Sequence, residues 1–249
     1  MNQQHLQLKI RGELIMKHYA YNSPFKMKDN EGVEYTLKVI NDDCPESPRV
    51  WSNLCTMICW HNHYNLGDTH NYDGIEDFFQ TLCKEVLSKG WDETDELYWQ
   101  DMFKMLKESN LILIKAINIY DHSGITVSTS NSYPYNDRWD AGIVGFIYVT
   151  KKTIFEECGD ITEENWKERA DEYLEGEMKT YDQYLRGDVY GYRLTKKVTI
   201  YSICPHCGEV IKECENEEEV DSCWGFYGDC LEENGILDYL SDLEFVEED

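Results

Sequence analysis

The sequence lacks long apolar runs. Stretches such as Leu111–Ile114 end after four residues, far short of the ~20 apolar residues that a membrane-spanning helix needs. The first eighteen residues, MNQQHLQLKIRGELIMKH, contain no apolar block like the one at the centre of a signal peptide. We therefore expect a cytoplasmic protein that is neither exported nor inserted into a membrane.

Basic residues are also scarce, with 23 Lys and Arg against 49 Asp and Glu and a formal net charge of −26. The bias grows along the chain, because residues 151–249 hold 28 acids and 10 bases, and no base follows Lys212. Such a surface repels nucleic acid and anionic membranes and attracts basic protein surfaces. Direct nucleic-acid binding is therefore not expected. The alternative role for the same acids is a solvated surface that keeps the protein soluble.

Proline is rare, with five residues, and the chain contains no internal repeat or low-complexity linker. Hydrophobic residues make up 41% of the sequence and aromatic residues 13%, which is enough apolar area for a packed core. Alternating or β-branched segments predict strands over 33–40, 55–60, 111–120, 143–149 and 188–203, the last as one long strand or a hairpin. Apolar residues at helical spacing predict helices over 74–89, 95–108, 162–186 and 232–240.

These elements predict an α+β fold, with a mixed, mostly antiparallel sheet and packed helices. The composition changes near residue 200, where the sequence becomes rich in cysteine and glutamate. We therefore expect a main domain over 1–200 and an acidic, Cys-rich C-terminal subregion over 201–249, or one continuous domain.

Ten cysteines without an export signal indicate free or metal-bound thiols and not disulfides. Cys204-Pro-His-Cys207-Gly has the form of a zinc knuckle, which supplies two thiolate ligands from one turn. No second close pair exists, so a hairpin must return later cysteines to the knuckle. We expect a structural zinc on Cys204, Cys207, Cys214 and Cys223, with Cys230 as an alternative ligand. Free structural thiols remain the competing interpretation, and a redox dithiol is disfavoured because neighbouring acids raise the pKa of a thiol.

A second metal-like cluster contains His61, His63, Asp68 and His70. Positions 61 and 63 share a face on a strand, but the aromatic residues around them favour polar packing, with contact to a partner or ligand as an alternative. Asp121, His122 and Ser123 are consecutive, so their side chains point apart and cannot form a catalytic relay. An enzyme or small-molecule-binding site that uses His61, His63, Asp68, His122 and Asp140 is nevertheless one functional alternative.

Several longer segments are distinctive: ESPRVWSNLCTMICWHNHYNLGD (46–68), DHSGITVSTS (121–130), WDAGIVGFIYV (139–149), YLEGEMKTYDQYLRGDVYGY (173–192) and DSCWGFYGD (221–229). Together they resemble a family of uncharacterised phage and prophage proteins. The resemblance implies a host-cell cytoplasm during infection as the setting. It implies no activity, and it does not include Cys204 or Cys207.

The charge and this setting together predict an inhibitory binding protein rather than an enzyme. Its acids would imitate nucleic acid and occupy a basic, nucleic-acid-binding surface of a host defence enzyme, of the anti-CRISPR or anti-restriction type. A structural or regulatory protein of the phage cycle is a further alternative. The expected contact residues are Glu213, Glu215, Glu217, Glu218, Glu219 and Asp221, then Glu163, Glu164, Glu168, Asp171, Glu172 and Glu175, with the tail acids Glu244, Glu247, Glu248 and Asp249.

Overall fold

The computed structural model describes residues 24–122, 124–130, 141–231 and 233–246, and it divides the chain into two compact units. Unit 1 combines Met1–Glu46 with Gly187–Asp249, and unit 2 is the segment between them, Ser47–Arg186. This division differs from the expected boundary at residue 200, which falls inside a strand, β7 (Val189–Ile203). The reason is that β7 pairs with a strand from the beginning of the chain, and composition along the sequence does not reveal such a pairing.

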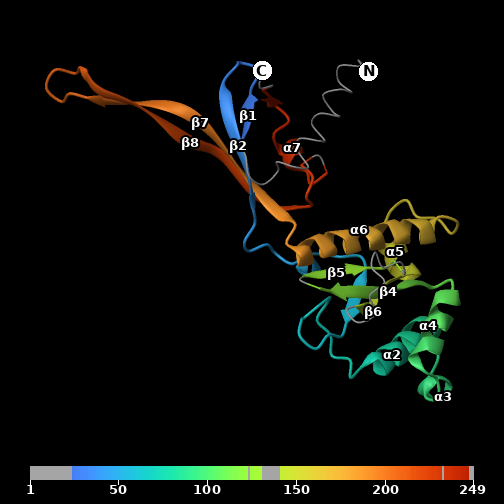
Figure 1. Ribbon diagram of the computed structural model, residues 1–249. Helices are drawn as coiled ribbons and strands as arrows, with labels where there is room; N and C mark the ends of the chain where they lie inside the picture. Colours follow the sequence, from blue (N-terminus) through green and yellow to red (C-terminus); the bar gives the residue numbers. More distant parts are fainter. Residues whose placement is uncertain (1–23, 123, 131–140, 232, 247–249) are drawn as a thin grey trace. The chain divides into compact units, whose positions relative to one another are not determined.

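Unit 1 is built on a five-stranded sheet in the order β8-β7-β2-β1-β9 (Figure 1). Its other strands are β1 (Phe25–Lys28), β2 (Glu34–Asn41), β8 (Val210–Tyr227) and β9 (Glu244–Phe245). Side chains from β1, β2, β7 and β8 form a buried core, which includes Met27, Leu37 and Tyr192. The short helix α7 (Ile236–Tyr239) adds Ile236 to this core and covers part of the sheet.

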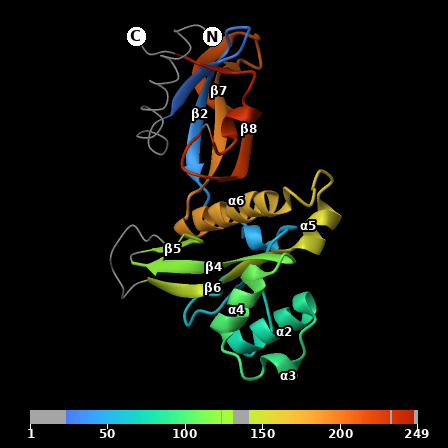
Figure 2. The same ribbon diagram turned by 90° about the vertical axis from the view of Figure 1, so that its right-hand side faces the viewer.

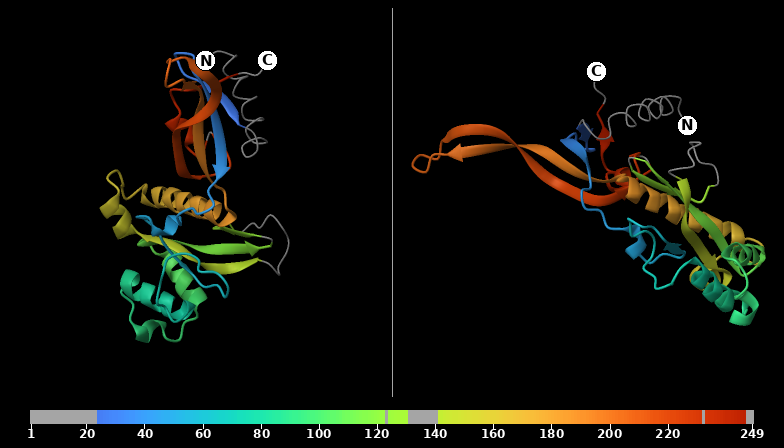
Figure 3. Two further views of the ribbon diagram at one scale, coloured as in Figure 1. Left: turned by 90° about the vertical axis from the view of Figure 1, so that its left-hand side faces the viewer. Right: turned by 60° about the horizontal axis from the view of Figure 1, so that its bottom comes forward.

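The β7–β8 hairpin continues beyond the rest of this sheet. The last pair between β2 and β7 is Tyr35 with Lys196, whereas β7 and β8 remain paired as far as Ile203 with Val210. We call residues 195–219 the arm: it consists of the two-stranded extension, residues 197–217, and the two pairs at its base, Thr195 with Glu219 and Lys196 with Glu218. Figure 3 shows it as the orange hairpin that runs on past the blue strands β1 and β2.

Unit 2 contains a four-stranded sheet in the order β3-β6-β4-β5 between two layers of helices (Figure 2). The strands are β3 (Thr56–Cys59), β4 (Ile112–Asp121), β5 (Ile125–Ser128) and β6 (Ala141–Thr150). The helix α6 (Trp166–Arg186) packs on one face, and α2 (Ile75–Leu87) and α4 (Trp99–Glu108) pack on the other. Three short helical segments complete the unit: η1 (Pro48–Val50), α3 (Trp91–Thr94) and α5 (Lys151–Glu157).

The helices form where the apolar spacing predicts them. In α6, Trp166, Ala170, Leu174, Met178 and Tyr181 recur every three to four residues and are buried against the sheet. In α2, Phe78, Phe79 and Leu82 are buried against the opposite face of the sheet. All strand pairings of the described residues are antiparallel, so the α+β prediction is confirmed. Within the same residues, no helix is both long enough and apolar enough to cross a membrane.

The sequence did not predict β8 as a strand. Its middle, ECENEEEVDS, is dominated by glutamate, a residue depleted in strands. It becomes a strand because fourteen of its residues pair with β7, which has strong strand character. Cross-strand pairing has therefore overridden the local preference of this segment.

Candidate functional site

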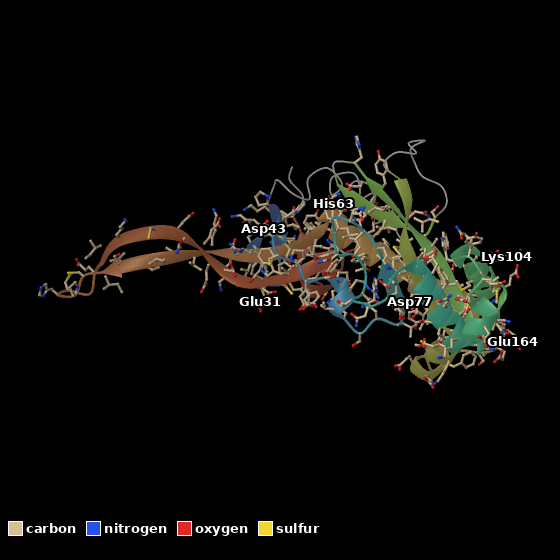
Figure 4. All side chains as sticks on the ribbon, turned by 90° about the horizontal axis from the view of Figure 1, so that it is seen from below. Glu31, Asp43, His63, Asp77, Lys104 and Glu164 are labelled. Atoms are coloured by element: carbon tan, nitrogen blue, oxygen red, sulfur yellow. The ribbon has the colours of Figure 1, made fainter. Side chains whose placement is uncertain are left out.

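The arm is the longest largely exposed segment in the described part of unit 1. Both of its strands are exposed to solvent along most of their length. The exposed side chains include apolar ones, which are usually buried in a core. Ile203, Val210 and Ile211, next to the tip, are 60%, 57% and 66% exposed. Ile200 and Tyr201, three and two residues before Ile203 in the same strand, are also exposed. Figure 4 shows side chains projecting from both sides of the orange ribbon along this length.

The tip of the arm is the turn that contains the two knuckle cysteines. The Cys204 amide donates to the Glu209 carbonyl at 2.7 Å, and the Gly208 amide donates back to the Cys204 carbonyl at 2.9 Å. Gly208 takes a left-handed conformation with φ of +75°, which glycine adopts without steric cost. The backbone N–H groups of Cys207 and His206 donate to the Cys204 sulfur and lower the pKa of that thiol. The turn thus places the two cysteines close together, as a metal knuckle does, and the Cys207 thiol donates to a carboxylate oxygen of Glu209 at 3.7 Å.

The structure does not bring the other expected zinc ligands to this turn. Cys214 lies opposite Ile200, four residues before Cys204, and Cys223 lies opposite Tyr192, twelve residues before it. At about 3.3 Å per strand residue, these offsets correspond to roughly 13 Å and 40 Å. The described residues contain no group of three or more His, Cys, Asp or Glu that could hold a metal ion. The expected four-cysteine set therefore needs correction, because an extended ribbon keeps its cysteines apart.

The acidic residues of β8 follow the period of the strand. Glu213, Glu215, Glu217 and Glu219 occupy alternate positions and therefore share one face of the ribbon, while Glu218 lies on the other face. Asp221 lies nearer the sheet and accepts a hydrogen bond from the Tyr192 hydroxyl at 2.6 Å. The row on one face was not foreseen, although the alternation E-C-E-N-E-E-E is visible in the sequence.

Three of the four glutamates in this row, and Glu218 on the other face, lie beside basic side chains from neighbouring strands. The closest approaches are 3.5–3.8 Å between partly exposed groups: Lys197 with Glu215, Lys38 with Glu217, Lys196 with Glu218 and Arg193 with Glu219. Counting charges along the chain after Lys212 suggested an acidic segment without nearby bases. Strand pairing corrects that interpretation, because it places four bases beside it.

The expected contact acids of unit 2 lie on α6 or just before it. Lys115 pairs with Asp171 and Glu175, Lys151 pairs with Glu163, and Arg169 pairs with Glu172. Glu164 and Glu168 are exposed. Of the tail acids, Glu244 lies in β9, whereas Glu247, Glu248 and Asp249 lie outside the described residues. Three of the six acids of unit 2, Glu163, Asp171 and Glu175, therefore pair with a base from another element, whereas Glu172 pairs within α6 itself.

The histidines do not assemble into one site. The His61 ring stacks on Tyr64 at 5.0 Å and lies 6.0 Å from His63, which matches the polar-packing interpretation. His70 places Nε2 3.0 Å from the Cys59 carbonyl. His122 belongs to the turn between β4 and β5, where its amide donates to the Gly124 carbonyl at 3.2 Å. Asp140 lies outside the described residues.

Asp68, the carboxylate of that expected cluster, belongs instead to a buried ion-pair cluster around Arg49. The Arg49 side chain is only 4% exposed. Its Nε and Nη2 donate to the two Asp68 oxygens at 2.8 and 2.9 Å, and its Nη1 donates to Glu177 at 2.9 Å. The carboxylates also accept backbone N–H groups, Asp68 from Met57 and Glu177 from Leu54 and Cys55. The cluster is well satisfied and ties the segment before β3 to α6.

Sequence reasoning missed Arg49. The available signal was its isolation, because no other Lys or Arg occurs between Lys38 and Lys84. Next to the cluster, a shallow pocket of about 430 Å³ is lined by residues that include Asp68, His70, Tyr72 and Asp77. Asp68 is already held by Arg49 and the Met57 amide, so its carboxylate belongs to the ion-pair cluster.

Comparison with protein-family models, with curated proteins and with solved structures finds no match to this chain. The candidate site is therefore identified from the structure alone. The arm is chosen because it extends beyond the sheet and contributes no side chain to the buried core.

Proposed function

We propose that this chain is a binding protein, not an enzyme, and that its arm engages a basic, nucleic-acid-binding surface of another protein. The single observation that carries the proposal is the row Glu213, Glu215, Glu217 and Glu219 on one face of an exposed two-stranded ribbon. Alternate strand residues lie about 7 Å apart, which gives one carboxylate for about every two phosphates of one strand, counted along the axis of a double helix.

The arm contributes little to the folding of unit 1, which supports a role in binding. A two-stranded hairpin in water is marginally stable at best, because it has no third strand and no core. The arm also leaves Ile200, Tyr201 and Ile203 exposed by 44–60%. Exposed apolar side chains beside charged ones are typical of a surface that another protein covers.

The basic neighbours of these glutamates do not prevent such binding. The pairs with Lys197, Lys38 and Arg193 are partly exposed, and pairs of this kind contribute only ~0–1 kcal/mol each. An arginine from a partner, which can bind a carboxylate through two parallel hydrogen bonds, can therefore displace them. The net charge of −26 adds long-range attraction toward a basic groove.

The resemblance to phage and prophage proteins supplies the setting for this proposal. In an infected bacterium, a chain that occupies the nucleic-acid groove of a restriction or CRISPR enzyme would inhibit that enzyme. The inhibition would be competitive with nucleic acid, because both ligands use the same Lys and Arg side chains.

The test compares two variants with the same change in charge. In the arm variant, Glu213, Glu215, Glu217 and Glu219 are all changed to Gln. In the control variant, Asp92, Glu93, Asp95 and Glu96 of unit 2, which are exposed, are changed to Asn or Gln. A partner is captured from host lysate at low salt with the parent chain, and its association kinetics and its competition with duplex DNA are then measured for all three proteins.

We expect the arm variant to associate about tenfold more slowly at low salt and with a weaker dependence on salt. The control variant should retain most of the parent rate, and DNA should compete with the parent chain. Equal losses in both variants would mean that only net charge matters. Binding that is unaffected by DNA, or by the arm variant, would contradict the proposed groove contact.

A further inference from the structure

The tip of the arm offers half of a metal site in an accessible position. Cys204 and Cys207 lie in one turn, with backbone N–H groups directed at the Cys204 sulfur. A structural zinc site takes four ligands in a tetrahedron, most often thiolates and imidazoles. Strand register keeps Cys214 and Cys223 away from the turn. The Glu209 carboxylate lies 3.7 Å from the Cys207 sulfur, but the described part of the chain contains no group of three or more His, Cys, Asp or Glu that could hold a metal ion.

A second copy of the tip supplies the two missing ligands with the same geometry. Two-fold symmetry is the commonest way in which identical chains associate, and it places the same residues on both sides of the contact. Because the turn ends a ribbon that extends beyond the sheet of unit 1, two tips can approach without the sheets meeting. We infer that two copies of this chain share one zinc ion at their tips, each contributing Cys204 and Cys207.

The surroundings of the tip fit this contact between copies. Residues 202–212 contain one acid, Glu209, and one base, Lys212, so the end of the arm has no net formal charge in an otherwise acidic chain. Ile203, Val210 and Ile211 flank the turn and are at least 57% exposed. A tip-to-tip contact would remove part of this apolar surface from water, which favours association.

The chemistry of the ligands selects the metal. Four thiols bind as thiolates, so each releases its proton as the ion enters. Soft thiolate ligands favour zinc over magnesium or calcium, which prefer oxygen ligands. The inference goes beyond the proposed function, because it assigns a site of self-association and not a contact with the partner.

The experiment measures metal content and mass on the same preparation of the full chain. The protein is purified under a phosphine reductant without chelator, and elemental analysis is combined with sedimentation velocity. We expect half an equivalent of zinc per chain and a dimer. Removal of the metal with a chelator should give monomers, and addition of zinc chloride should restore the dimer at one ion per two chains.

Matched variants locate the site. Cys204→Ser should lose both the zinc and the dimer, whereas Cys214→Ser on the arm and Cys44→Ser outside it should retain both. The Cys204 backbone pairs only within the exposed turn, so circular dichroism should show an unchanged fold. Chelation of the parent chain tests the same inference without any substitution.

Three results would overturn the inference. They are one zinc per monomer, no bound zinc, or a dimer that survives both chelation and Cys204→Ser. Failure here is distinguishable from failure of the proposed function. The arm acid-to-Gln variant leaves both knuckle cysteines in place and should still dimerise with zinc. High salt should also preserve the dimer, because salt screens the repulsion between acidic arms, while the same salt weakens capture of a basic partner.

Discussion

The Arg49 cluster of unit 2 and the glutamate row of the arm both pair acids with bases, yet the two regions use charge differently. The Arg49 side chain is 4% exposed, and its guanidinium N–H groups donate to two carboxylates and a backbone carbonyl at 2.8–2.9 Å. On the arm, Lys197 and Glu215 are 69% and 75% exposed and 3.6 Å apart. The first arrangement holds two segments of the fold together, and the second leaves its charges exposed to solvent.

Burial accounts for this difference. A charge that leaves water loses its hydration, so it must be matched by close partners in the protein. A charge that stays in water keeps its hydration and gains little from a neighbour. The number of acids and bases in a segment therefore does not indicate its role, whereas the exposure of each pair does.

The strongest test of this contrast is to remove the basic partner in each region. Arg49→Ala leaves Asp68 and Glu177 without their counter-charge, and we expect it to lower the free energy of unfolding by ~3–5 kcal/mol. Lys197→Ala on the arm should change it by only ~0–1 kcal/mol. Urea unfolding of both variants measures the two effects. A decrease of less than about 1 kcal/mol in the free energy of unfolding of Arg49→Ala would show that the cluster does not stabilise the fold.

A second test compares the thiols of the two regions in reduced, metal-free protein. Burial raises the pKa of Cys59 to about 12, whereas backbone N–H donors lower that of Cys204 below its ordinary value. A lower pKa means more thiolate at a given pH, and Cys204 is also accessible. Allowing for the lower nucleophilicity of a low-pKa thiolate, we expect iodoacetamide to alkylate Cys204 about a hundredfold faster than Cys59 at neutral pH. Peptide mass spectrometry measures both rates, and similar rates would contradict the described environments.

A third test uses two glycines of the same strand, β6, in unit 2. A Cβ on Gly145 would overlap the Ile58 carbonyl and the Cys59 side chain of the adjacent strand, while a Cβ on Gly142 meets nothing within 4 Å. We expect Gly145→Ala to destabilise the protein by ~1–3 kcal/mol and Gly142→Ala to stay within about 0.5 kcal/mol of the parent. Thermal unfolding of the two variants is the measurement. Equal effects would mean that β3 and β6 are not in close contact.

The local elements of the fold were predictable because their signals are local. The stripe from Trp166 to Tyr181 has the period of a helix, and the helix α6 forms there with that stripe buried. The β-branched segment 111–120 becomes β4 (Ile112–Asp121) for the same kind of reason. The knuckle turn at Cys204–Gly208 was also visible, because its residues are adjacent in the chain.

By itself, the sequence determined the acidic charge, the cysteines without disulfides and most helices and strands. Only the tertiary structure decided that residues near 35 pair with residues near 195, that Arg49 meets Glu177 across 128 positions, and that Cys223 lies opposite Tyr192. Contacts between distant positions form when whole elements pack together. The favourable free energy depends on the total apolar area that the packed elements remove from water, which no single residue determines. The arm also depends on pairing between distant residues. It exists because β7 and β8 continue to pair after the sheet beside them has ended.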